Sequence, residues 1–173
     1  MNLNQLQNNV TENSFNVFAS VSLSPDNIQS VAENVAFSTK NAAHTNHGRL
    51  ACMWALNHVM QMATGEAILA DSRGNYNLST IQVTKKLAND TARFKEIVAG
   101  EIKPGDIAIA ATEYANGGVS HRGHGYIVGS KNAVGEHLAW HNSSSRAMWR
   151  QSGTIEGYAT KRHGERLRFF RVK

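Results

Sequence analysis

The chain has one cysteine, two prolines and no long apolar run in its 173 residues. A single cysteine cannot form an intramolecular disulfide, and it excludes a four-cysteine zinc site. No stretch approaches the roughly 18 consecutive apolar residues of a membrane span, so no span is expected. The low proline count and a hydrophobic share of 41% predict a folded domain rather than a disordered chain.

Residues 1–23 are rich in Asn, Ser and Gln and lack a sustained helical or strand period. They are predicted to form a polar N-terminal arm, and residues 24–173 are predicted to form a single domain. The N-terminus has neither a basic start nor an apolar signal core, so we expect no signal peptide.

Positive charge is concentrated at the end of the chain, where KRHGERLRFFRVK (residues 161–173) holds six of the 18 Lys and Arg residues. Basic residues interleaved with Phe169 and Phe170 suit a nucleic-acid contact. The apolar positions of RLRFFRVK are typical of a final strand with charged residues on a solvated face. We favour the strand and expect no nucleic-acid partner, although anionic polymers in general remain candidates.

An apolar stripe predicts a first helix in SPDNIQSVAENVAFSTKNAA (residues 24–43). Ser24 is the expected N-cap, and Pro25 occupies the first helical position. The stripe consists of Ile28, Val31, Val35 and Phe37.

A second apolar run, GRLACMWALNHVM (residues 48–60), is typical of a buried helix. This helix is expected to continue to about Ala63 and to end near Gly65, because glycine is the usual helix stop. The patterns of residues 78–90 and 91–100 predict one or two further helices.

The second half of the chain has strand-like patterns instead. IKPGDIAIAA (residues 102–111) makes a turn at Pro104 and Gly105 and then alternates Ile with Ala. Three more strand-like runs follow, separated by Gly, Asn and Ser: HGYIVGS, EHLAWHN and RLRFFRVK. Helices followed by an antiparallel sheet predict an α+β fold.

Cys52 stands in the first turn of the second helix, where the unpaired N–H groups and the positive dipole end stabilise a thiolate. Free cysteines are also commonly buried as small apolar side chains, so the helix alone leaves packing and chemistry both open. A nucleophilic thiol needs an imidazole base and a third polar group that orients it. His124 precedes a strand between two glycines, and His141 and Asn142 lie near the end of the next strand.

The order of four motifs resembles the papain-like cysteine peptidases and amidases of the NlpC and CHAP type. The motifs are CMWALNHVM, IKPGDIAIA, GHGYIVGS and a polar residue on the following strand. The resemblance covers residues 46–173 and implies a papain-like fold. It implies that Cys52 is the nucleophile, that His124 is the base, and that the third residue is His141 or, alternatively, Asn142. His141 follows His124 by 17 residues, which is closer to the CHAP spacing, so we select His141. Strand alternation places the two candidates on opposite faces.

The resemblance also implies donors for the oxyanion that thiolate attack creates. The backbone N–H of Cys52 is the first. Asn46 lies six residues upstream, at the offset where papain carries a side-chain donor, and is the second; it is otherwise a polar loop residue. Asp106, in the PGD turn, is interpreted as a turn-forming residue rather than a catalytic one.

The segments HRGH and HLAWH offer four imidazoles for a zinc or nickel site. Their spacings place two ligands on one face only in a helix, whereas both segments have strand patterns. We therefore expect no metal and no cofactor.

The resemblance implies a cysteine hydrolase that cleaves an amide bond in bacterial peptidoglycan, as an endopeptidase or an amidase. Without a signal peptide, the expected delivery is by lysis, a phage particle or a dedicated secretion system, which suits a lysin or an antibacterial effector. The expected partner is a peptidoglycan peptide, together with an immunity or inhibitor protein if the chain is an effector. The alternatives are an acyltransferase or a peptidase acting on protein amides, or a non-catalytic module that binds wall polymer or nucleic acid.

Overall fold

The computed structural model describes residues 22–111, 123–161 and 167–173, and most of the predicted N-terminal arm lies outside these ranges. The described chain is α+β, as predicted. Its helices are α2 (Pro25–Asn34), α3 (Cys52–Thr64), α4 (Thr80–Asn89) and α5 (Ile155–Lys161), with one 3₁₀ turn, η1 (Ala99–Glu101). Its strands are β1 (Phe37–Ser38), β2 (Phe94–Ile97), β3 (Ile107–Ala110), β4 (His124–Lys131), β5 (His137–Ser143), β6 (Met148–Thr154) and β7 (Leu167–Val172). Among these helices, none has the length and apolar character needed to cross a bilayer.

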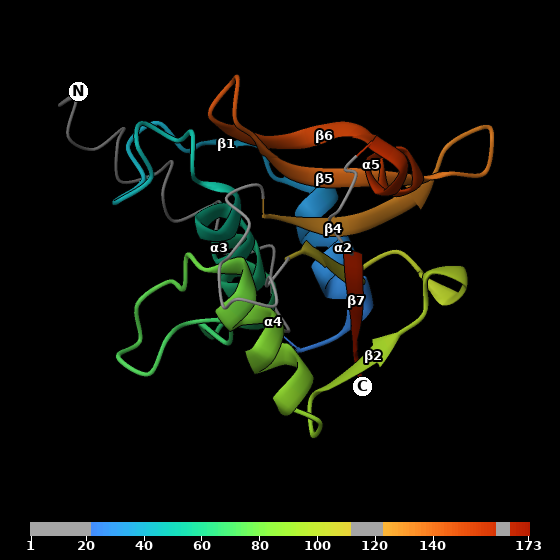
Figure 1. Cartoon of the computed structure of the whole chain (residues 1–173), viewed down its shortest axis with the longest axis horizontal. Helices are drawn as coiled ribbons and strands as arrows, with labels where there is room; N and C mark the ends of the chain where they lie inside the picture. Colours follow the sequence, from blue (N-terminus) through green and yellow to red (C-terminus); the bar gives the residue numbers. More distant parts are fainter. Residues whose placement is uncertain (1–21, 112–122, 162–166) are drawn as a thin grey trace, which may run out of the picture.

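The strands form one open antiparallel sheet in the order β1-β6-β5-β4-β3-β7-β2. In Figure 1, β4, β5 and β6 run across the view, whereas β7 and β2 run steeply to them, so the sheet is strongly twisted. The strands that carry His124 and His141, β4 and β5, are neighbours at its centre.

The two faces of the sheet are covered by different helices. Helices α2, α3 and α4 pack on one face, and their buried side chains join those of Ile107, Ile109, Ile127 and Phe170 in the larger core. Helix α5 lies against β5 and β6 on the other face (Figure 1). There Ile155 and Tyr158 pack with a smaller cluster, made up of Ile97, Ala108, Tyr126, Val128, Ala139 and Phe169.

Local sequence signals explain where the first two helices begin and end. The Ser24 hydroxyl accepts a hydrogen bond from the Asn27 N–H (3.2 Å), and Pro25 occupies the first position of α2, as predicted. Helix α3 ends at Gly65, which has the left-handed backbone (φ 74°) expected of a C-cap glycine. Both predicted signals are confirmed.

One predicted helix is too long, and one predicted helical segment is not an α-helix. The first helix ends at Asn34 instead of continuing to residue 43, and Phe37 belongs to β1, where it pairs with Trp149. Residues 91–100 form strand β2 and the turn η1 rather than a helix. The reason is long-range pairing: β2 forms the sheet edge beside β7, with Phe94 opposite Val172, and this pairing outweighs local propensity.

The turn before β3 provides a matched pair of glycine substitutions. Gly105 has φ 87°, and a Cβ there would lie 2.1 Å from the Pro25 carbonyl oxygen. Gly135 has nearly the same backbone (φ 86°) but nothing within 4 Å of that position. We expect Gly135→Ala to reduce the free energy of unfolding by about 1–2 kcal/mol, the left-handed penalty alone. Gly105→Ala is expected to cost at least about 2 kcal/mol more, because the α2 backbone must move.

Urea unfolding of both variants measures the difference directly. Equal destabilisation by the two alanines would mean that the turn at Gly105 does not pack against the start of α2 as described.

Candidate active site

Cys52 is the first residue of α3, and its side chain is half-buried. The N-cap residue, Ala51, makes no side-chain capping hydrogen bond, and the first turn carries no acidic residue. The positive end of the helix is therefore not neutralised by the helix's own side chains, and it favours an anion at Cys52. The buried residues that anchor α3 are Met53, Ala55, Leu56, Asn57, Val59, Met60 and Ala63.

The loop ahead of α3 has an unusual backbone. His44, Asn46 and His47 all have positive φ values, of 60°, 49° and 53°. Such conformations are costly outside glycine and persist only where the surrounding structure enforces them. The loop is closed by a main-chain hydrogen bond from the Leu50 N–H to the Thr45 carbonyl (2.9 Å).

Cys52 lies beside the start of β4. Its Sγ is 3.9 Å from the carbonyl oxygen of Gly123, the residue before His124. On the other side of His124, a Cβ at Gly125 would lie 2.9 Å from Sδ of Met53, the residue after Cys52. Gly125 thus lets the start of α3 approach the start of β4 closely, at the strand end where His124 stands. A Cβ at Gly123 would instead lie 2.4 Å from the Thr80 hydroxyl oxygen of α4.

His124 contacts His141 on the neighbouring strand. The Nε2 atom of His124 is 2.9 Å from the Nδ1 atom of His141, and each residue is only 6% exposed. Both rings also lie against Tyr126, with centroid distances of 4.7 and 5.2 Å. A hydrogen bond between buried imidazoles fixes the orientation of both rings.

Asn142 points to the opposite face of β5 and is fully buried. Its amide donates to the Gly48 carbonyl (3.1 Å), and its Oδ1 accepts a hydrogen bond from the Thr39 hydroxyl (2.7 Å). The structure therefore brings His141 into contact with His124, and it places Asn142 in contact with the loop that leads into α3.

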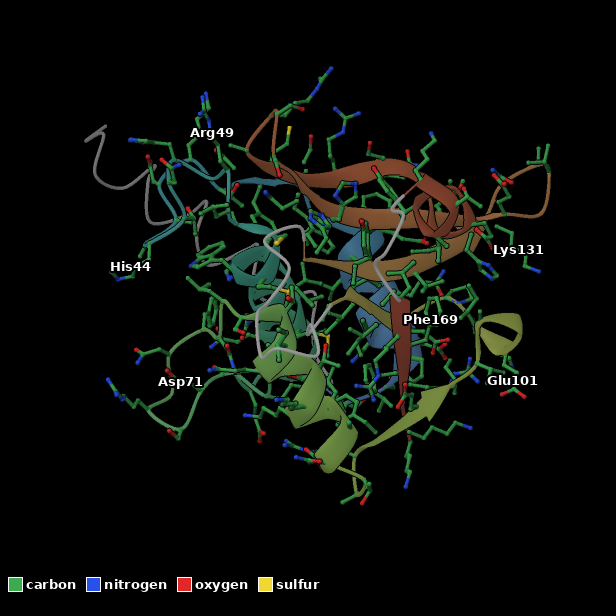
Figure 2. The ribbon with its side chains drawn as sticks, viewed as in Figure 1. His44, Arg49, Asp71, Glu101, Lys131 and Phe169 are labelled. Atoms are coloured by element: carbon green, nitrogen blue, oxygen red, sulfur yellow. The ribbon has the colours of Figure 1, made fainter. Side chains whose placement is uncertain are left out.

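Asn46 is exposed in the same loop, and its carbonyl accepts a hydrogen bond from the Arg49 N–H (3.2 Å). The side chains of His44 and Arg49 project outward from this loop (Figure 2). Of the two predicted donors, the Cys52 main chain lies in the first turn of α3 and Asn46 lies in the exposed loop before it.

Asp106 is held entirely by structural contacts. Its fully buried carboxylate accepts a hydrogen bond from the Lys103 N–H (2.6 Å) and two from the Arg171 guanidinium (2.8 and 2.7 Å). These bonds raise the pKa of Arg171 above its usual value. Arg168 makes a similar two-bond contact with Glu96 (2.8 and 2.6 Å). Two cations of the basic C-terminal segment are therefore paired within the molecule, and the predicted final strand is β7.

No group of three or more His, Cys, Asp or Glu side chains is placed to hold a metal ion within residues 22–111, 123–161 and 167–173. His121, in the HRGH segment, lies outside these ranges. The chain matches no protein-family model, no curated protein and no solved structure.

Tyr158, which the sequence did not indicate, joins the histidine pair. Its hydroxyl lies 3.1 Å from Nε2 of His141. It belongs to α5, a short helix whose pattern is too brief to predict. A second contact holds this helix on β5, because Nδ1 of His137 is 2.9 Å from a Glu156 carboxylate oxygen. Burial would raise the pKa of Glu156, but the hydrogen bonds from His137 outweigh it and the pKa is lowered.

A separate tyrosine–histidine contact lies farther along α3. Nδ1 of His58 is 3.1 Å from the Tyr76 hydroxyl, and Trp54 stacks on the His58 ring at 5.0 Å. Burial lowers the pKa of His58 and raises that of Tyr76. This cluster packs the outer side of α3 two turns away from the thiol.

Proposed function

We propose that the protein is a papain-like cysteine hydrolase of the NlpC and CHAP type that cleaves an amide bond in bacterial peptidoglycan. One observation carries the proposal: the start of α3 and the start of β4 meet at Cys52 and Gly123, while His124 is bonded to His141. A thiol at a helix N-terminus, an imidazole beside it and a third polar group on the imidazole are the parts that nucleophilic cysteine catalysis requires.

In the proposed reaction, His124 takes the Cys52 proton on Nδ1, the ring nitrogen that does not face His141. The thiolate attacks the amide carbonyl carbon, and the resulting oxyanion accepts a hydrogen bond from the Cys52 N–H at the start of α3. The His124 imidazolium then protonates the leaving amine as the carbon–nitrogen bond breaks. Water attacks the Cys52 thioester, with His124 as the base, and releases the acid product.

Two features support peptidoglycan as the substrate. The sequence resemblance is to peptidases and amidases that act on the wall, and a net charge of +5 suits an anionic wall polymer. The proposed substrate group is therefore an amide of a stem peptide or cross-bridge, cleaved by an endopeptidase or an amidase. Delivery by lysis, by a phage particle or by a secretion system, and control by an immunity protein in the effector case, belong to the same proposal.

The deciding experiment digests purified peptidoglycan with the protein and with its Cys52→Ala variant, followed by mass spectrometry of the soluble products. The parent is expected to release fragments with one new amine and one new carboxylate, and the variant to lose at least about 1,000-fold in rate. Met53→Leu is the matched control, because it changes the neighbouring side chain and leaves the thiol in place.

Cleavage by Cys52→Ala at the rate of the parent would overturn the mechanism. No cleavage by the parent, but transfer of an acyl group to an added amine, would favour the acyltransferase alternative. Binding to wall polymer without Cys52 dependence would favour a non-catalytic module.

A further inference from the structure

The ring of His141 is engaged at both nitrogens. Its Nδ1 lies 2.9 Å from Nε2 of His124 and 3.0 Å from the main-chain carbonyl oxygen of Asn142. Its Nε2 lies 3.1 Å from the hydroxyl of Tyr158. A neutral imidazole has one N–H and one lone pair, so the tautomer of His141 sets the direction of every one of these bonds.

The tautomer of His141 decides whether His124 can act as the base. A neutral His124 can take the thiol proton on Nδ1 only while its own proton is on Nε2, and that Nε2–H donates to Nδ1 of His141. Once His124 has taken the thiol proton on Nδ1, its Nε2 carries an N–H that needs an acceptor. Before and after the transfer, therefore, the lone pair of His141 must be on Nδ1 and its proton on Nε2. In the other tautomer the His141 proton is on Nδ1, beside the Asn142 carbonyl, and it donates to Nε2 of His124. The His124 proton is then on Nδ1, where it blocks transfer from the thiol.

We propose that Tyr158 is a positioning residue whose hydroxyl accepts the Nε2–H of His141 and thereby stabilises the Cys52 thiolate and His124 imidazolium pair. This inference rests on the proposed roles of Cys52 and His124. A hydroxyl both donates and accepts, so Tyr158 stays bonded to His141 in either tautomer. Phenylalanine does neither. In the tautomer of His141 that lets His124 act as the base, phenylalanine would leave a buried Nε2–H without this acceptor. That costs more than the lone pair left without its donor in the other tautomer, so the substitution favours the tautomer that blocks the base.

The fold holds Tyr158 in place for this role. Its ring packs on His141 and Tyr126 at centroid distances of 5.2 and 5.0 Å. Helix α5 is also held to β5 by the contact between His137 and Glu156 (2.9 Å). The titratable side chains packed around the His141 ring include His124 and Tyr126 from β4 and Tyr158 from α5.

The test measures alkylation of Cys52 by iodoacetamide between pH 5 and pH 9. Cys52 is the only cysteine, so the rate reports this thiol alone, and no peptidoglycan is needed. Tyr158→Phe is expected to move the midpoint of the rate profile to higher pH and to slow alkylation about 10-fold at pH 6. The matched control is Tyr76→Phe, which removes the other tyrosine–histidine bond of the same length, 3.1 Å. It is expected to leave the profile unchanged.

A second variant separates tautomer control from packing. In His141→Asn, the amide oxygen takes nearly the position of Nδ1 and accepts from His124 without any tautomer to set. In this background, Tyr158→Phe is expected to change the alkylation rate by less than about twofold.

Three results would overturn the role of Tyr158: an unchanged profile in Tyr158→Phe, the same 10-fold loss in the His141→Asn background, or an equal loss in Tyr76→Phe. Each leaves the peptidoglycan proposal standing, because that proposal is tested by cleavage products. Conversely, an inert parent on peptidoglycan with a shifted Tyr158→Phe profile would reject the substrate and keep this inference.

Discussion

Replacing His124 by alanine is expected to slow amide cleavage about 10³- to 10⁴-fold. The variant loses the base that takes the Cys52 proton, and it loses the acid that protonates the leaving amine. His124 is the first residue of β4, and its backbone pairs with Ala110 of β3, so the fold should persist. His58→Ala is the control, since its ring lies two turns from the thiol on the outer side of α3. A His124→Ala variant with half the parent rate would remove His124 from the mechanism.

The same assay separates the two candidates for the third residue. His141→Ala is expected to lower the cleavage rate about 10- to 100-fold, because the His124 ring loses its orienting contact. Asn142→Ala is expected instead to lower the free energy of unfolding by about 2 kcal/mol, because Thr39 and Gly48 lose buried partners. Equal rates in the two variants, measured where both are folded, would contradict the choice of His141.

Asp106→Asn is expected to reduce the free energy of unfolding by about 3–5 kcal/mol. The carboxylate is fully buried, and the Arg171 side chain facing it is only 15% exposed. Removing one charge of such a pair leaves the other uncompensated away from water. Because Asp106 serves the turn before β3 and not the thiol site, the alkylation rate of Cys52 should not change in the folded variant.

Glu96→Gln is the matched control for Asp106→Asn. Glu96 of β2 pairs with Arg168, which lies in β7 like Arg171, but the Glu96 and Arg168 side chains are 40% and 29% exposed. Solvent screens such a pair, so the expected cost is below about 1 kcal/mol. Urea unfolding of both variants decides the point. Similar costs in the two variants, or a loss of thiol reactivity in Asp106→Asn, would contradict a purely structural role for Asp106.

The helices and strands could be predicted where local signals are strong. The caps at Ser24 and Gly65 mark helix ends by hydrogen bonding within a few residues, and alternation identified β3, β4, β5 and β7. Prediction failed at β2, whose residues have no strong local preference and become a strand by pairing with β7. Strand β6 and helix α5 were also missed, because their apolar positions are few and gain their packing partners only in the folded chain.

The candidate site divides in the same way. From the sequence by itself, Cys52 could be placed at a helix start and His124 at a strand start between glycines, because capping, periodicity and glycine placement are local properties. Only the tertiary structure decided that His141 contacts His124, while Asn142 contacts the loop before α3. The tertiary structure also placed the Tyr158 hydroxyl beside Nε2 of His141. The sequence of a strand does not determine what covers each of its faces. Here Tyr158 of α5 contacts His141 on one face of β5, and Gly48 of the loop before α3 contacts Asn142 on the other. These segments are far from β5 or from each other in the sequence, so only folding brings them together.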